Sequence, residues 1–338
     1  LCAGATPTLI YCEFRDNSAA RGGGLYKEGG SIVHEMLVEG CEFTENRAGD
    51  RGGGFAYYNT NGNKDILLTA CTFSKNHSVA VGGGISLSVN NSQCKLQLKR
   101  CVLMENEGSA SQDGTAIGLI EDSETGSLVL DVDSCFFSSN KTKTTAAISS
   151  FGGFMTIGNS TFKLHGAQTS PLNNRGSLFF RGTKSKIYNS NFEKSFAKFG
   201  SISSVGFNSQ VEFFNCTFFS NGDSLGMIYS QTTAYLFTLK NCIFNQNTLN
   251  NNGKLFSIGG SQLTISHCLA DIPDCSSFAS GTVTCGPGML YLQDPLFLDT
   301  AAADFRLHPC SPAIDAGDNA VVDSLGILTD IAGLPRIL

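Results

Sequence analysis

The sequence predicts an all-β fold, a parallel β-solenoid of about ten coils, from three observations. The pattern C-x-F-x-x-N recurs along the chain, as in "CEFTEN" at residues 41–46, with steps of 25–34 residues between successive copies. Apolar residues stand three and five positions before each cysteine, which is the period-two alternation of a β-strand. A third apolar run follows a glycine-rich stretch in the first three copies. Three strands per repeat describe one coil of a solenoid.

Each repeated residue type has a structural role in such a stack, where equivalent positions lie about 4.8 Å apart. Small cysteines suit a tight corner and phenylalanines fill the interior. Asparagine tolerates left-handed backbone geometry, and its side-chain amide can bond to the amide one coil away. The glycines allow positive φ and close approach of neighbouring coils. The predicted ladders consist of Cys12, Cys41, Cys71, Cys101, Cys135, Cys216, Cys242 and Cys268; Phe14, Phe43, Phe73, Phe137, Phe218 and Phe244; and Asn17, Asn46, Asn76, Asn106, Asn140, Asn221 and Asn247.

Length and composition restrict the class of protein. A chain of 338 residues can bury a sizeable core, and 38 glycines with 15% charged residues fit β structure with many turns. The net charge of −6 argues against a nucleic-acid partner, and no apolar run approaches the roughly 20 residues of a membrane helix. Thirteen cysteines without zinc-type spacing favour a secreted, extracellular protein. The start at Leu1, without a signal-like segment, indicates a mature or trimmed product.

The Phe-x-x-Asn motif, paired with a following Gly-Gly-aliphatic motif, resembles the repeats of the chlamydial polymorphic membrane proteins. The resemblance spans about residues 10–270. It implies a right-handed parallel β-helix that displays an adhesive surface. The motifs that carry it are Phe14/Asn17 with Gly23-Gly24-Leu25, Phe43/Asn46 with Gly53-Gly54-Phe55, and Phe73/Asn76 with Gly83-Gly84-Ile85.

From Gly286 onward the sequence no longer follows the repeat pattern. Residues 294–320 and 329–338 resemble the C-terminal closing segment of many secreted right-handed β-helix proteins. The two resemblances together predict a single-stranded right-handed parallel β-helix with a C-terminal cap. We therefore divide the chain into a β-helix at residues 1–285 and a last coil with a capping segment at residues 286–338.

Cysteines outside the ladder are the better disulfide candidates. Cys275 and Cys285 bracket a Ser/Gly loop and could join across it. Whether ladder cysteines form disulfides stays open, because the spacing of adjacent coils is compatible with that bond. Cys2, Cys94 and Cys310 have no obvious partners.

Five asparagines stand in glycosylation sequons. Asn76 and Asn140 are also ladder positions, so a glycan there would remove a ladder bond. The outward-facing candidates are Asn90, Asn159 and Asn215.

Many right-handed β-helices are polysaccharide lyases or glycosidases, which need paired acids or a metal held by acids. Asp131 and Asp133 share one strand face, but they flank an inward residue and point to solvent. The five histidines occupy different repeat positions. Turns and an ion pair of the closing segment account for Asp315, Asp318, Asp330 and Arg336.

We therefore predict no catalytic, cofactor-binding or metal-binding residue. The expected function is that of a non-enzymatic extracellular structural or adhesive protein at a cell surface or in a filament. Expected partners are copies of itself, another surface protein, or glycans, without nucleic acid and without membrane insertion. The alternative is a carbohydrate-active enzyme, a polysaccharide lyase or glycoside hydrolase, which would need a groove lined by acids and aromatic residues.

Overall fold

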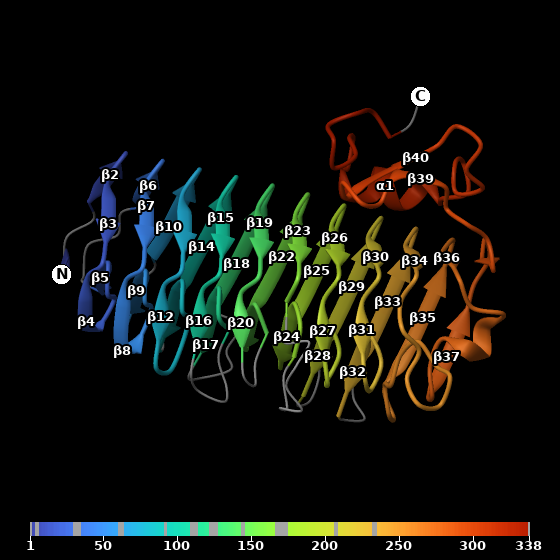
Figure 1. The fold of residues 1–338 in the computed structure, drawn as a ribbon, viewed down its shortest axis with the longest axis horizontal. Helices are drawn as coiled ribbons and strands as arrows, with labels where there is room; N and C mark the ends of the chain where they lie inside the picture. Colours follow the sequence, from blue (N-terminus) through green and yellow to red (C-terminus); the bar gives the residue numbers. More distant parts are fainter. Residues whose placement is uncertain are drawn as a thin grey trace.

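The computed structural model describes residues 2–3, 7–29, 35–59, 64–90, 93–108, 114–121, 128–142, 146–165, 175–205, 209–231 and 235–336. It confirms the predicted fold class: the chain winds into a right-handed parallel β-solenoid whose coils stack along one axis (Figure 1). Two sheets have eleven strands each over the described residues, so the coil count differs somewhat from the expected ten.

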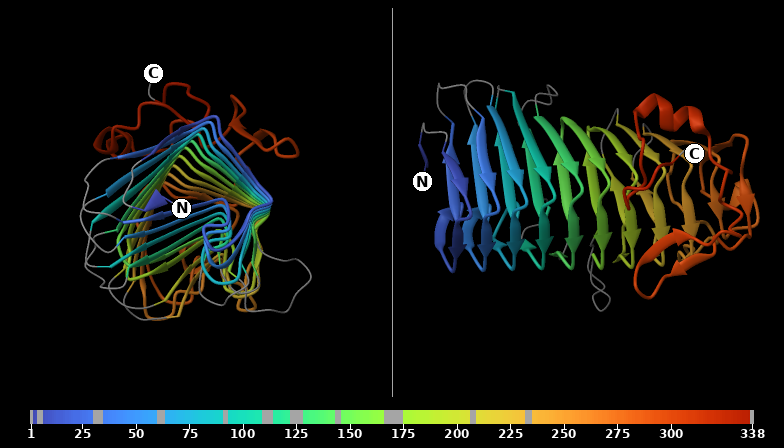
Figure 2. Two further views of the ribbon diagram at one scale, coloured as in Figure 1. Left: turned by 90° about the vertical axis from the view of Figure 1, so that its left-hand side faces the viewer. Right: turned by 90° about the horizontal axis from the view of Figure 1, so that it is seen from above.

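Three long parallel sheets form the walls of the solenoid, and Figure 2 shows them in a view along its axis. Sheet A has nine strands, in spatial order β1 (Cys2–Ala3), β5 (Leu25–Glu28), β9 (Phe55–Asn59), β13 (Ile85–Val89), β17 (Ile117–Glu121), β21 (Ile148–Phe151), β24 (Leu178–Arg181), β28 (Ile202–Ser204) and β32 (Ile228–Ser230). Sheet B has eleven, β2 (Thr8–Ile10), β6 (Met36–Glu39), β10 (Lys64–Thr69), β14 (Cys94–Lys99), β18 (Leu128–Asp133), β22 (Phe154–Gly158), β25 (Lys184–Tyr188), β29 (Gln210–Phe214), β33 (Leu236–Lys240), β35 (Gln262–Ser266) and β37 (Thr282–Cys285).

Sheet C also has eleven strands and contains the repeated phenylalanines. They are β3 (Glu13–Arg15), β7 (Glu42–Thr44), β11 (Thr72–Ser74), β15 (Val102–Met104), β19 (Phe136–Ser138), β23 (Thr161–Lys163), β26 (Asn191–Glu193), β30 (Thr217–Phe219), β34 (Ile243–Asn245), β36 (Leu269–Ala270) and β38 (Leu290–Tyr291). A shorter sheet D continues several coils, with β4 (Ser18–Arg21), β8 (Arg47–Arg51), β12 (His77–Ser78), β16 (Glu107–Gly108) and β20 (Lys141–Thr142). In two later coils, β27 (Phe196–Ala197) pairs with β31 (Gly222–Asp223).

Two left-handed residues per coil turn the chain at the ends of the sheet C strand. In the third coil these are Ala70, with φ 52°, immediately before Cys71, and Lys75, with φ 55°, immediately before Asn76. The expectation that the ladder asparagine itself adopts this geometry is therefore wrong. The residue before it makes the turn, which directs the asparagine side chain into the interior.

The glycine run has two separate causes. Gly52 has a φ of +63°, which side chains disfavour. Gly53 has no room for a Cβ atom, because that atom would overlap the carbonyl oxygen of Gly83 in the next coil. The run therefore permits both the turn and the close approach of coils, as predicted.

The C-terminal segment lies along the side of the solenoid, over its later coils (Figure 1). It contains an antiparallel pair, β39 (Phe297–Asp299) and β40 (Asp304–Leu307), and one helix, α1 (Asn319–Leu325). The side chain of Asp318 caps the helix by accepting from the backbone N–H of Ala320, and Gly326 ends it with φ 64°. The domain boundary at residue 286 stays a prediction.

Candidate functional site

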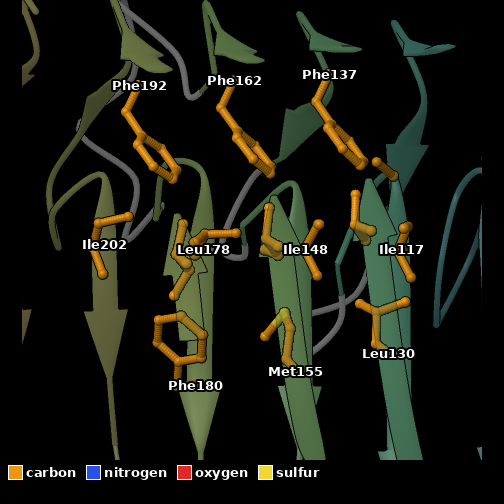
Figure 3. Packing of buried hydrophobic residues seen from close by; sticks show 14 of the residues in the cluster. Ile117, Leu130, Phe137, Ile148, Met155, Phe162, Leu178, Phe180, Phe192 and Ile202 are labelled. Atoms are coloured by element: carbon orange, nitrogen blue, oxygen red, sulfur yellow. The ribbon is translucent and has the colours of Figure 1, made fainter. Parts of the chain in front are cut away.

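The predicted phenylalanine ladder lies inside the solenoid and forms two stacks of nearly parallel rings. Phe14, Phe43 and Phe73 stack with centroids 4.5–4.6 Å apart, and Leu103 follows them in register. The second stack runs through five coils, with centroid separations of 4.6–5.1 Å, and Figure 3 shows three of its rings. Its members are Phe137, Phe162, Phe192, Phe218 and Phe244.

The asparagine ladder also forms, and its bonds join each coil to both neighbours. The Asn76 Nδ2 atom donates to Asn106 Oδ1 at 3.0 Å and to the Phe43 carbonyl oxygen at 2.8 Å. Asn106 Oδ1 also accepts from the Asn76 backbone N–H at 3.1 Å. Equivalent bonds link Asn17 through Asn140 and, in later coils, Asn221 with Asn247. Since these amides are buried, apart from that of the exposed Asn17, each satisfied rung stabilises one register of the stack.

The cysteine ladder consists of free thiols, which settles the question left open by its spacing. The ladder cysteines Cys12, Cys41, Cys71, Cys101, Cys135, Cys216, Cys242 and Cys268 are all unpaired and, apart from Cys12, buried. Burial raises the pKa of Cys41, Cys216 and Cys242, and a hydrogen bond to the Cys101 thiol, ahead of burial, raises that of Cys71. These groups are therefore neutral packing residues at a corner.

Cys275 and Cys285 form the predicted disulfide, with Cα atoms 6.1 Å apart. The bond closes the loop that precedes β37. Cys94 is buried and Cys310 is exposed. The side chain of Cys2 lies outside the described residues.

Asp131 and Asp133, which the sequence offered as candidate catalytic acids, each contact a side chain of a neighbouring coil. Asp131 Oδ2 lies 2.6 Å from Lys95 Nζ, and Asp133 Oδ1 accepts from Asn159 Nδ2 at 2.8 Å. The acids of the closing segment make turns: Asp318 caps α1, and Asp330 Oδ1 accepts from the backbone N–H groups of Ala332 and Leu334. Over the described residues, no group of three or more His, Cys, Asp or Glu side chains is arranged to hold a metal ion.

The glycosylation candidates lie in different surroundings. Asn90 is half-buried at the end of β13. Asn159 is half-buried and bonded through its amide to Asp133. The Nδ2 atom of Asn215, which a glycan would occupy, is buried without a hydrogen-bond partner. Outward exposure was therefore overestimated for Asn215, and the use of all three sites stays a prediction.

Two titratable side chains, those of Asp223 and His165, are buried in the solenoid. Asp223, 1% exposed, accepts from the Ala197 backbone N–H and the Ser201 hydroxyl, and burial raises its pKa to about 8. His165, also 1% exposed, takes a ladder position of asparagine, and burial lowers its pKa to about 3. Both point to the interior, so they bear on stability and not on surface chemistry.

An outer surface cluster was missed, which we call the aromatic–basic strip. It lies on sheet A, whose strands β24, β28 and β32 are neighbours along the lower edge of Figure 1. The Arg175 guanidinium lies 4.1 Å from the centroid of the Phe179 ring and 5.6 Å from that of Phe199. Phe199 also lies 5.3 Å from the Tyr229 ring. The strip comprises Phe151, Arg175, Phe179, Arg181, Lys198 and Phe199.

Charged residues extend the strip at its edges. The Arg181 guanidinium lies 5.5 Å from the centroid of the Phe151 ring, and Lys198 Nζ lies 5.3 Å from that of Phe199. Both basic residues are exposed. A sequence signal for this cluster exists: residues 141–200 contain nine of the 23 Lys and Arg residues but one of the 29 Asp and Glu residues. The net charge of the whole chain, −6, does not reveal that basic residues are concentrated in this segment.

No family model matches the chain, and a search of curated proteins found no relative. The structure shows that the repeats form a parallel β-solenoid. Because no relative was found, the resemblance of the repeats to those of the chlamydial polymorphic membrane proteins stays a prediction. The part of the chain that the structure describes contains no helix with the length and hydrophobicity that a membrane crossing requires.

Proposed function

We propose that the chain is a non-enzymatic extracellular protein that serves as a rigid structural or adhesive rod at a cell surface or in a filament. The observation that carries this proposal is the continuity of the buried ladders. The phenylalanine positions stay in register from Phe14 to Phe244, broken by leucine at position 103. The repeated residues thus serve stacking, and the outward residues of each strand are free to vary.

The extracellular part of the proposal is supported by the Cys275–Cys285 disulfide, because disulfides persist in oxidising compartments. The cysteine count supports it less than expected. Buried ladder thiols need no oxidising environment, and they account for most of the cysteines.

The adhesive part rests on the resemblance of the repeats to the chlamydial polymorphic membrane proteins and on the aromatic–basic strip as an exposed surface. The filament part rests on the last coil. Its interior side chains Val283, Met289 and Tyr291 are only partly buried against the core. A second solenoid could continue the stack there, as in other strand-addition contacts.

Sedimentation and electron microscopy of the purified chain test the filament part. We expect ordered polymers that Val283→Lys abolishes, because the ammonium group would be buried at the contact. Leu328→Lys, at a position 79% exposed, is the matched control. Circular dichroism checks that both variants fold. If the wild-type chain stays monomeric at micromolar concentration, the filament part is contradicted and only the adhesive part of the proposal remains.

The alternative, a carbohydrate-active enzyme, has its best acid in Asp223, whose raised pKa suits a general acid. Its side chain is buried and both carboxylate oxygens accept bonds, so it has no path to a substrate. Incubation with pectin, alginate and chondroitin, followed by assay for unsaturated products and new reducing ends, decides between the two. Turnover of any of these polymers would establish the enzyme.

A further inference from the structure

We propose that the aromatic–basic strip binds an acidic polysaccharide, whose sugar faces lie on the partly exposed rings of Phe151 and Phe199 and whose carboxylate or sulfate groups pair with the flanking cations. This inference rests on the proposed function as an extracellular adhesive protein, and it assigns that function a surface and a partner class.

Charge complementarity is the first argument. The chain is acidic overall, with a net charge of −6, yet its middle coils are strongly basic. Residues 141–200 hold nine basic residues against one acid, which leaves 14 basic and 28 acidic residues for the rest of the chain. The single acid, Glu193, is buried and lies 3.5 Å from Lys163. A positive region in an otherwise negative molecule attracts an anion and orients it.

The stacking of cations on rings is the second argument. A guanidinium that lies flat on an aromatic ring leaves the donors at its edge directed along the surface, where they can bind a carboxylate or sulfate with two hydrogen bonds. The Arg175 guanidinium, 4.1 Å from the centroid of Phe179, is close enough for such stacking, whereas Arg181, 5.5 Å from the centroid of Phe151, makes a looser cation–ring contact. Phe151 and Phe199 are partly exposed beside these cations, whereas Phe179 is only 4% exposed. An apolar surface bordered by cations therefore matches a polymer that alternates apolar and anionic groups.

The register of sheet A gives the strip its length. Phe151 pairs with Arg181, and in the next column Phe179 pairs with Ser203, which pairs with Tyr229. The groups thus recur from coil to coil along the solenoid axis at about 4.8 Å per coil. Phe179 and Ser203 are buried in these columns, so an extended polymer running parallel to that axis would contact the accessible members Phe151, Arg181 and Tyr229, whereas a small anion would contact one.

The same charges argue against nucleic acid. DNA carries one charge per about 1.7 Å of its axis and needs a long basic track. The strip offers three cations, and the remainder of the chain has twice as many acids as bases. A polymer with at most one or two charges per sugar suffers less repulsion beyond the strip and offers C–H groups to the rings.

The test measures binding of the purified chain to polygalacturonate, alginate and chondroitin sulfate, with dextran as the neutral control, by titration calorimetry at 0.15 M salt. We expect saturable binding to at least one acidic polymer and none to dextran. Arg181→Gln/Lys198→Gln should weaken binding at least about tenfold. The matched control, Lys184→Gln/Lys186→Gln, removes two charges from the same coil on sheet B and should leave affinity within about twofold.

Equal losses in the two double variants would overturn the strip as the binding surface, because attraction would then depend on net charge alone. Tighter binding of oligo(dT) than of any polysaccharide would overturn the partner class. Absence of binding to every acidic polymer would overturn the inference but leave the proposed function standing. Turnover of a polymer, monitored in the same samples, would instead overturn the proposed non-enzymatic function.

Discussion

The side-chain amide of Asn241 makes two hydrogen bonds to the backbone of Asp318, a residue 77 positions later in the chain. Asn241 Oδ1 accepts from the Asp318 N–H at 2.8 Å, and its Nδ2 donates to the Asp318 carbonyl oxygen at 3.1 Å. Asn189, at the equivalent corner of an earlier coil, donates to the carbonyl oxygen of Thr329. Corner asparagines thus hold the C-terminal segment against the side of the solenoid.

Asn241→Gly should release part of that segment. Glycine retains the left-handed backbone at this corner, where Gly40 already occurs with φ 59°, so the loss reflects the two bonds and not strain. We expect a loss of about 1–2 kcal/mol from the local opening free energy. Hydrogen exchange over residues 297–336 should rise in this variant.

Ser134→Gly is the control, because it changes the same corner position, with φ 55°, in an earlier coil. Equal exchange of residues 297–336 in the two variants would show that the asparagine bonds do not hold the segment.

Phe73→Ala should destabilise the solenoid by about 3–5 kcal/mol, because it leaves a cavity between Phe43 and Leu103. Phe73 is fully buried. Phe154→Ala, at an outward position 46% exposed, should cost much less. Chemical denaturation of both variants provides the comparison, and similar midpoints would contradict the interior stack.

The sequence predicted the ladders because each rung repeats the same local contact, so a short motif contains the information for the whole interior. Phe73 meets Phe43 in the fold for the same reason that the two share a repeat position. The left-handed turn was expected at Asn76 but occurs at Lys75, the residue before it. Residue type pointed to the wrong position, because asparagine favours such turns and lysine does not.

Non-repeating contacts could not be predicted in this way. The attachment of Asp318 to Asn241 joins distant positions that share no pattern. The aromatic–basic strip draws on the outward residues of several strands and on the residues that follow β27, and its members become neighbours only when the coils are in register. Asp223 is likewise recognisable only once its surroundings are known, because an acid next to glycine in sequence looks like a solvent-exposed turn.

Thiol labelling should distinguish the buried ladder cysteines from Cys310, which is exposed. In the native chain we expect an alkylating reagent to modify Cys310, which is exposed, while Cys71, which is buried with a raised pKa, stays unmodified. Unfolding in denaturant should expose Cys71 to the reagent. Peptide mass spectrometry locates the label, and rapid native labelling of Cys71 would contradict a closed interior.

Asp223 should make stability fall as pH rises. Its folded pKa of about 8 exceeds its ordinary value of 3.8, so the folded state keeps a proton that the unfolded state has lost. The contribution is complete below about pH 4 and declines by about 1.4 kcal/mol per pH unit up to about pH 8. Asp223→Asn should remove this contribution to the pH dependence, since an amide oxygen can still accept from the Ala197 N–H. Asp65→Asn, at an exposed position, is the control and should leave the slope unchanged.

His165 should give a slope of the opposite sign. Its folded pKa of about 3 lies below the ordinary 6.5, so the unfolded state binds the proton first, and stability is lost as pH falls from 6.5 towards 3.

Between about pH 4 and 6.5 the two slopes cancel in the wild-type chain. Asp223→Asn alone should therefore become more stable with rising pH over that range. His165→Asn should become less stable with rising pH, and should gain about 1–2 kcal/mol at pH 7 from ladder bonds that asparagine restores. Denaturation curves at pH 4, 5, 6 and 7 measure both, and parallel profiles for the two variants would show that these groups do not control the pH dependence.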